Sequence, residues 1–111
     1  MTAVEIEKRG IPKTVLTIYE EQVREKIYYE ESGEKEYDDR ELEKITMVMT
    51  LKKFGFGNQE IADYFCLEEK GQETKTERIR MLARHRQCIL DEIHQKEKIL
   101  GELDYLRHEL S

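Results

Sequence analysis

Two histidines and a cysteine near the C-terminus have the residue types of a metal site. His85 and Cys88 are three residues apart, and His94 follows six residues later. On a helix, residues three apart lie on neighbouring faces, so two ligands are conceivable, but His94 projects from a different face. The interpretation that we favour is structural: Cys88 is a small buried apolar residue and the histidines face solvent. Cys66 is expected to pack beside Phe65 in the same way, so no metal is predicted.

Carboxylates and tyrosines are the other side chains that could do chemistry. The acidic pairs at 38–39 and 68–69 lie in polar segments and are typical of solvated surfaces. Three tyrosines could stack on a ligand, but their more usual role is to cover the apolar face of a hairpin; they are Tyr28, Tyr29 and Tyr37. No nucleophile–base pair, Gly-rich phosphate loop or metal-ligand set is visible, so we predict neither an enzyme nor a cofactor.

Length and composition limit the size of the core. The chain has 111 residues, of which 38% are hydrophobic and 40% charged, so a monomer can build only a modest core and burial shared with a second copy is expected. No apolar run is long enough for a membrane span or a signal core, and we expect a soluble, cytoplasmic protein. The two cysteines have no Cys-x-x-Cys spacing and predict no disulfide scaffold. The net charge of −6 argues against indiscriminate nucleic-acid binding, so any DNA-reading surface must be a local patch.

Hydrophobic spacing predicts a helix-turn-helix and a hairpin in the first part of the chain. A glycine and Pro12 separate a short first segment, in which Val4 and Ile6 can pack, from a second helix over 13–24. Residues 26–37 favour two strands around Ser32-Gly33, which is the pattern of a hairpin wing, although an exposed loop is the alternative.

Two further helices follow this hairpin. Asp38 or Asp39 can cap the first of them, in which Leu42, Ile45, Met49 and Phe54 share one face with Val48 beside it. Gly55 ends that helix and Gly57 begins the next, with Ile61, Tyr64 and Phe65 buried. We therefore predict a winged helix-turn-helix domain over 1–66 and a polar linker over 67–75.

Residues 76–111 predict one long helix. They contain no proline, and a helix of this length extends beyond the small domain that precedes it. An apolar stripe on such a helix needs a partner. Pairing with a second copy is favoured over folding back on the chain's own domain, and we predict an antiparallel coiled coil in a homodimer. The expected interface residues are Ile79, Leu82, Ile89, Ile93, Leu100, Leu103, Leu106 and Leu110.

In this order of elements the chain resembles the MerR family of bacterial transcription regulators, from about residue 4 to residue 110. In the second helix Leu16, Tyr19 and Glu20 match the family pattern, while Thr14 and Thr17 replace two arginines. The hairpin keeps Gly33 and Tyr37 and has Lys35 for an arginine, but Glu34 departs from the pattern. Further along, the matching positions are Leu42, Ile45, Leu51, Gly55-Phe56, Glu60-Ile61 and the closing Leu103-Asp104-Tyr105-Leu106.

The resemblance implies a homodimer that binds a palindromic operator in double-stranded DNA, with RNA polymerase or another regulator as further partners. Because the sequence stops at Ser111, we expect a member without an effector domain. DNA contacts would fall on Lys13, Thr14, Thr17 and Tyr19 in the second helix and on Arg24, Lys26, Tyr28, Lys35 and Arg40 around the wing. The replaced arginines and the acidic N-terminal half support an alternative, in which the protein does not bind DNA and acts as an antagonist by pairing with another regulator.

Overall fold

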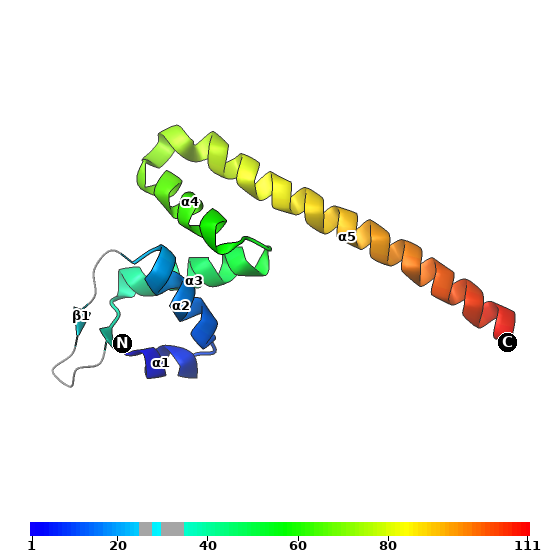
Figure 1. Ribbon diagram of the computed structural model, residues 1–111, viewed down its shortest axis with the longest axis horizontal. Helices are drawn as coiled ribbons and strands as arrows, with labels where there is room; N and C mark the ends of the chain where they lie inside the picture. Colours follow the sequence, from blue (N-terminus) through cyan, green and yellow to red (C-terminus); the bar gives the residue numbers. More distant parts are fainter. Residues whose placement is uncertain (25–27, 30–34) are drawn as a thin grey trace.

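A small helical body and one long helix that projects from it make up the fold (Figure 1). The computed structural model describes residues 1–24, 28–29 and 35–111. Along these residues the chain forms two short helices, a pair of strands, two longer helices, one turn of 3-10 helix and the long last helix. This order confirms the predicted mainly helical class with a helix-turn-helix, paired strands and a long C-terminal helix.

The first two helices form the helix-turn-helix. Gly10 turns the chain between α1 (Ala3–Lys8) and α2 (Lys13–Gln22) with a φ of +92°, a left-handed conformation that glycine adopts without steric cost. Of the two residues expected to pack from α1, Ile6 is fully buried, but Val4 is 56% exposed. Val4 projects to solvent because it lies two residues from Ile6, on a different side of the helix. The buried residues of α2 are Val15, Leu16, Ile18 and Tyr19.

The two strands lie beside the start of the chain. β1 (Tyr28–Tyr29) and β2 (Lys35–Glu36) are antiparallel, as predicted, and the expected turn between them falls outside the described residues. Tyr37 lies directly after β2 and donates its backbone N–H to the carbonyl oxygen of Met1 at 2.8 Å. The carbonyl oxygen of Tyr37 in turn accepts a hydrogen bond from the amino group of Met1 at 2.9 Å. The first residue of the chain therefore fixes the end of β2 against α1.

The next two helices complete the body. α3 (Asp39–Lys53) begins at Asp38, whose carboxylate accepts the backbone N–H of Glu41 at 2.8 Å. Gly55, with a φ of +99°, ends this helix before α4 (Asn58–Glu69). The apolar residues at helical spacing on the buried faces are Ile45, Val48 and Leu51 in α3 and Ile61, Tyr64 and Phe65 in α4.

The two phenylalanines beside Gly55 have opposite environments. The sequence placed Phe54 on the buried face of α3, but Phe54 is the C-cap residue and is 39% exposed. Phe56 is 0% exposed and packs edge-on against Tyr64, with ring centroids 6.1 Å apart. The left-handed turn at Gly55 reverses the chain after Phe54, and this change of direction brings Phe56 into the core.

The predicted polar linker over 67–75 is largely helical. α4 continues to Glu69, a 3-10 helix η1 (Gly71–Thr74) follows, and α5 (Lys75–Leu110) begins at once. The guanidinium of Arg78 donates to the carbonyl oxygen of Gly71 at 3.1 Å, which holds the connection against the start of α5. A short, hydrogen-bonded turn of this kind fixes the direction of α5. The division into two domains remains a prediction.

Most of α5 lies outside the body. The helix has 36 residues, so it is about 54 Å long, and the described chain extends over 68 Å. Met81 near its start is buried and Leu90 is half-buried, whereas Ile89 and the large apolar residues from Ile93 onward are exposed. Among the described residues, no helix is both long and apolar enough to cross a membrane.

Replacing the buried phenylalanine tests this description of the core. We expect Phe56→Ala to lower the free energy of unfolding by about 3–5 kcal/mol, because a fully buried aromatic ring is lost. Phe54→Ala, two residues away, should cost less than about 1 kcal/mol. Urea unfolding of both variants, followed by circular dichroism, measures the difference, and equal losses would contradict the assignment of Phe56 to the core.

Candidate DNA-binding surface

One face of α2 presents cationic and hydroxyl side chains to solvent. Lys13, Thr14 and Thr17 are all exposed, as the sequence predicted, because they alternate with the buried residues of the helix. The hydroxyl of Thr17 donates to the backbone carbonyl of Lys13 at 3.2 Å, so this hydroxyl retains acceptor capacity for an outside donor. A face of this kind can contact phosphates and base edges in a groove of DNA.

Two further exposed cations, which the sequence did not single out, precede α2 in the chain. Lys8 and Arg9 are exposed at the end of α1, directly before the turn that leads to Lys13. The run of basic residues on both sides of the glycine turn was the signal in the sequence that could have pointed to them.

A hollow of about 370 Å³ opens between α1, α2 and β2. Lys13 and Thr17 line it from α2, and Lys35 lines it from the hairpin. Two carboxylates, Glu7 and Glu20, lie in the same lining. The structure therefore brings the α2 residues and the hairpin lysine together, as expected for a winged helix-turn-helix, but it gives the hollow a balanced charge.

Arg24 is an internal residue, which corrects its assignment to a phosphate contact. Its side chain is 2% exposed, and its Nε lies 2.8 Å from a carboxylate oxygen of Glu41. Its Nη2 donates to the backbone carbonyl of Glu36 at 2.6 Å, and its guanidinium lies 4.4 Å from the ring centre of Tyr37. These contacts use the guanidinium within the protein, so it is not available to DNA.

Tyr19 is also internal, which corrects its place among the DNA contacts. It is 2% exposed and donates its hydroxyl to Glu41 at 2.9 Å. Burial and the neighbouring Glu41 carboxylate raise the pKa of the Tyr19 phenol well above its usual range. The hydroxyl therefore keeps its proton and acts as a hydrogen-bond donor at neutral pH.

Glu20 joins α2 to the hairpin. Its carboxylate accepts hydrogen bonds from Lys35 Nζ at 3.0 Å and from the hydroxyl of Tyr37. Burial alone would raise the pKa of the Glu20 carboxyl, but these two hydrogen bonds, together with the charges of Lys35 and Arg24, lower it overall. Lys35 is therefore partly neutralised at the position where a phosphate contact was predicted.

The remaining predicted DNA contacts have different outcomes. Arg40 is exposed in the first turn of α3. Lys26 lies outside the described residues; for Tyr28 only the strand that contains it is described. Their roles stay predictions.

The side chains considered for a metal site have other environments than the sequence predicted. His85 was expected to face solvent, but its ring stacks on Phe56 at 4.2 Å between ring centres, and its Nε2 lies 2.7 Å from a carboxylate oxygen of Glu60. Cys66 and Cys88 were expected to be buried, and both are exposed in the single chain. Along residues 1–24, 28–29 and 35–111, no three potential ligands are grouped as a metal ion requires. The contact of His85 with Phe56 and Glu60 holds α5 on the turn between α3 and α4.

Two solved structures share this arrangement. A protein assigned to the MerR family of transcriptional regulators, from Listeria monocytogenes, superposes with a TM-score of 0.71 at 23% identity, covering 95% of this chain and 81% of that one. A MerR family transcriptional regulator from Bacillus thuringiensis has a TM-score of 0.63 at 19% identity, covering 88% and 87%. No family model and no curated protein matches the sequence. The chain therefore has the fold of MerR-type regulators.

The lowered pKa of Glu20 predicts a pH-dependent effect of its removal. Because the folded protein holds this proton less tightly than the unfolded chain, the contribution of Glu20 is present above about pH 5 and is lost as pH falls through the folded pKa. We expect Glu20→Gln to cost about 1 kcal/mol near pH 7 and progressively less towards about pH 3. Urea unfolding across this pH range measures the trend.

Glu21→Gln provides the matched control, because Glu21 is the exposed neighbour of Glu20 on the same helix. A Glu20→Gln effect that is independent of pH, or equal to that of Glu21→Gln, would contradict the described network.

Proposed function

We propose that this chain is a transcription regulator that binds double-stranded DNA as a homodimer at a roughly palindromic operator. The observation that carries the proposal is the exposed face of α2, with Lys13, Thr14 and Thr17, placed beside a two-stranded hairpin in a fold shared with MerR-type regulators. Lys8, Arg9 and Arg40 are also exposed and add positive charge to the N-terminal body. The hydroxyls and lysine would read and bind the DNA, and the hairpin would contact the adjacent backbone.

A homodimer is supported by the apolar stripe of α5. At 3.6 residues per turn, Leu82, Ile89, Ile93 and Leu100 lie within about 40° of one another around the helix. Ile89, Ile93 and Leu100 are at least 40% exposed in the single chain, and Leu103, Leu106 and Leu110 continue the exposed apolar surface. Burial of such side chains against a second copy contributes roughly 1.5–3 kcal/mol each, which favours pairing.

The charge distribution along α5 favours the antiparallel orientation. Residues 70–86 hold six basic and two acidic side chains, whereas residues 87–111 hold three basic and six acidic ones. Antiparallel pairing places the basic start of one helix beside the acidic end of the other. Parallel pairing would place like charges side by side, which is unfavourable.

A second candidate function is partner binding without DNA, as an antagonist of another regulator. The observation that favours it is the internal use of cations: Arg24 is paired with Glu41, and Lys35 is paired with Glu20. Glu20 and Glu21 also close the C-terminal end of the α2 face, where they would repel phosphates. The two candidates differ in whether the protein binds DNA or acts by pairing with another regulator.

Titration of the protein against its own upstream DNA at two salt concentrations separates the two candidates. We expect retardation that weakens steeply with salt, because phosphate neutralisation releases counterions. Lys13→Ala should lower the affinity and reduce the dependence of log K on log salt by about one unit. Lys98→Ala, which removes an exposed charge from α5 far from the body, is the matched control and should change neither.

Absence of retardation at low salt, with the dimer intact, would refute the DNA-binding proposal and leave the partner-binding one. Equal effects of the Lys13 and Lys98 substitutions would place the DNA elsewhere than on α2.

The proposed dimer has its own test. We expect Ile89→Glu combined with Leu103→Glu to give monomers, because two charges are introduced into the apolar stripe. Gln95→Glu adds a negative charge on another side of α5 and should leave the dimer intact. Sedimentation at micromolar concentration measures both, and a folded wild-type monomer at that concentration would contradict the proposal.

A further inference from the structure

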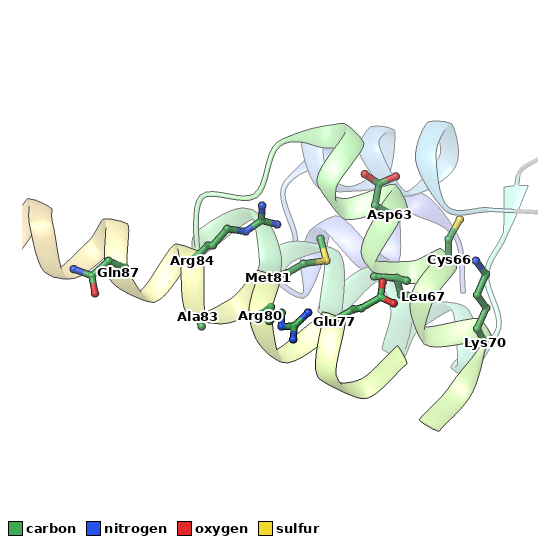
Figure 2. A pocket seen from close by; sticks show the side chains of 10 residues that line it. All are labelled: Asp63, Cys66, Leu67, Lys70, Glu77, Arg80, Met81, Ala83, Arg84 and Gln87. Carbon is green, nitrogen blue, oxygen red and sulfur yellow. The ribbon is translucent and has the colours of Figure 1, made fainter. Parts of the chain in front are cut away.

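A groove between α4 and the first turns of α5 is explained by the proposed dimer (Figure 2). It has a volume of about 910 Å³, and Lys70, Arg80 and Arg84 line it. These cations belong to the basic segment 70–86, which antiparallel pairing places beside the acidic end of a second copy's α5. The apolar part of the smaller hollow beside α2 has no such explanation.

The hollow between α1, α2 and β2 has an apolar wall next to Thr17. Ala3 and Val4 from α1 and Leu16 from α2 line the hollow together with Thr17. Val4 is 56% exposed, although its place in the sequence predicted that it would pack. A single exposed valine is ordinary on a protein surface. This one, however, borders a hollow on the helix that is proposed to enter a groove of DNA.

The side chain of Thr17 adds a methyl group to this wall. Its hydroxyl donates to the carbonyl oxygen of Lys13, one turn earlier in α2, at 3.2 Å. This bond turns the oxygen of the side chain toward the helix backbone, so the other branch, the γ-methyl, is directed away from it. The exposed face of α2 therefore presents a methyl group beside a hydroxyl whose proton is already used.

The remaining side chains of α2 limit the base edges that it can recognise. Arginine, asparagine and glutamine make the paired hydrogen bonds that identify guanine and adenine in the major groove. The sequence of α2 contains no arginine or asparagine, and its one glutamine is the half-buried Gln22 at its last position. Its one cation, Lys13, is its first residue. Apolar contact is left to the middle of the helix, and the apolar group in the major groove is the C5-methyl group of thymine.

We propose that Thr17 reads the C5-methyl group of a thymine in each half of the operator, and that Val4 completes the apolar surface around this methyl group. The inference rests on the proposed binding of DNA by α2 and names the base that this helix selects. Burial of one methyl group contributes about fourfold in affinity, so the two halves of a palindromic site together contribute about tenfold or more.

Uracil-substituted DNA tests the proposal on the full chain, because uracil differs from thymine only in lacking the C5-methyl group. The protein's own upstream DNA, synthesised with thymine or with uracil throughout, is titrated in a retardation assay at low salt. We expect the wild-type protein to bind the thymine DNA about tenfold or more tightly than the uracil DNA. Equal affinity for both would overturn this inference alone, whereas no retardation of either DNA would refute the proposed function and this inference with it.

Two substitutions of Thr17 separate the effect of the methyl group from that of the hydroxyl. Thr17→Ser keeps the hydroxyl and removes the methyl group, so we expect it to remove most of the difference between the two DNAs. Thr17→Val removes the hydroxyl but keeps a methyl group in its place, and it should retain the difference.

Thr46→Ser is the matched control for the loss of a methyl group from an exposed threonine. The hydroxyl of Thr46 makes the same kind of bond on α3, to the carbonyl oxygen of Leu42 at 2.9 Å, outside the proposed DNA contacts. Circular dichroism establishes that each variant is folded. A difference between the two DNAs that persists unchanged in folded Thr17→Ser would overturn the proposal, because uracil would then act through the shape of the DNA. Loss of the difference in Thr46→Ser would overturn it as well.

Discussion

The contact between Arg24 and Glu41 is the constraint on which the N-terminal body depends. A buried guanidinium is tolerated only when it is paired and hydrogen-bonded. Arg24 follows the last turn of α2, whereas Glu41 lies in the first turn of α3 and also accepts the hydroxyl of Tyr19. The same guanidinium donates to the carbonyl of Glu36 and covers the ring of Tyr37. One cation therefore fixes α2, the hairpin and α3 relative to one another.

This use of charge has a consequence for the surface. A cation that fixes the hairpin inside the protein is not available to a phosphate outside it. Glu20 has the same effect on Lys35, since it holds the lysine beside α2. The arrangement that places the hairpin next to α2 thus reduces the free positive charge beside α2, and on the described part of α2 itself Lys13 is the exposed cation. The largest excess of basic side chains lies elsewhere, over residues 70–86, so the fold separates its two cationic surfaces.

A second contact sets the direction of the long helix. His85 stacks on Phe56 and pairs with Glu60, so the start of α5 is held on the turn between α3 and α4. The partnership with His85 and the hydrogen bond from the Gly57 backbone lower the pKa of the Glu60 carboxyl. Because α5 is a single rigid rod of about 54 Å, a small change of angle at His85 becomes a large displacement at its far end. In the proposed dimer this contact therefore governs the separation of the two α2 faces.

The sequence by itself determined the order of the elements. Helical spacing in α2 to α5, a cap at Asp38 or Asp39 and the glycines at 10 and 55 are local features, and local features follow from backbone sterics and hydrogen bonding between near neighbours. The exposure of Lys13, Thr14 and Thr17 was predictable for the same reason, since it follows from the buried pattern of one helix. Only the tertiary structure decided the burial and the partners of Arg24, Tyr19 and His85. Each of these meets a partner at least 12 residues away in sequence, and no periodicity within one element reveals such a partner. The groove between α4 and α5 arises likewise from two helices brought together by a tight turn, where the sequence showed only a polar segment.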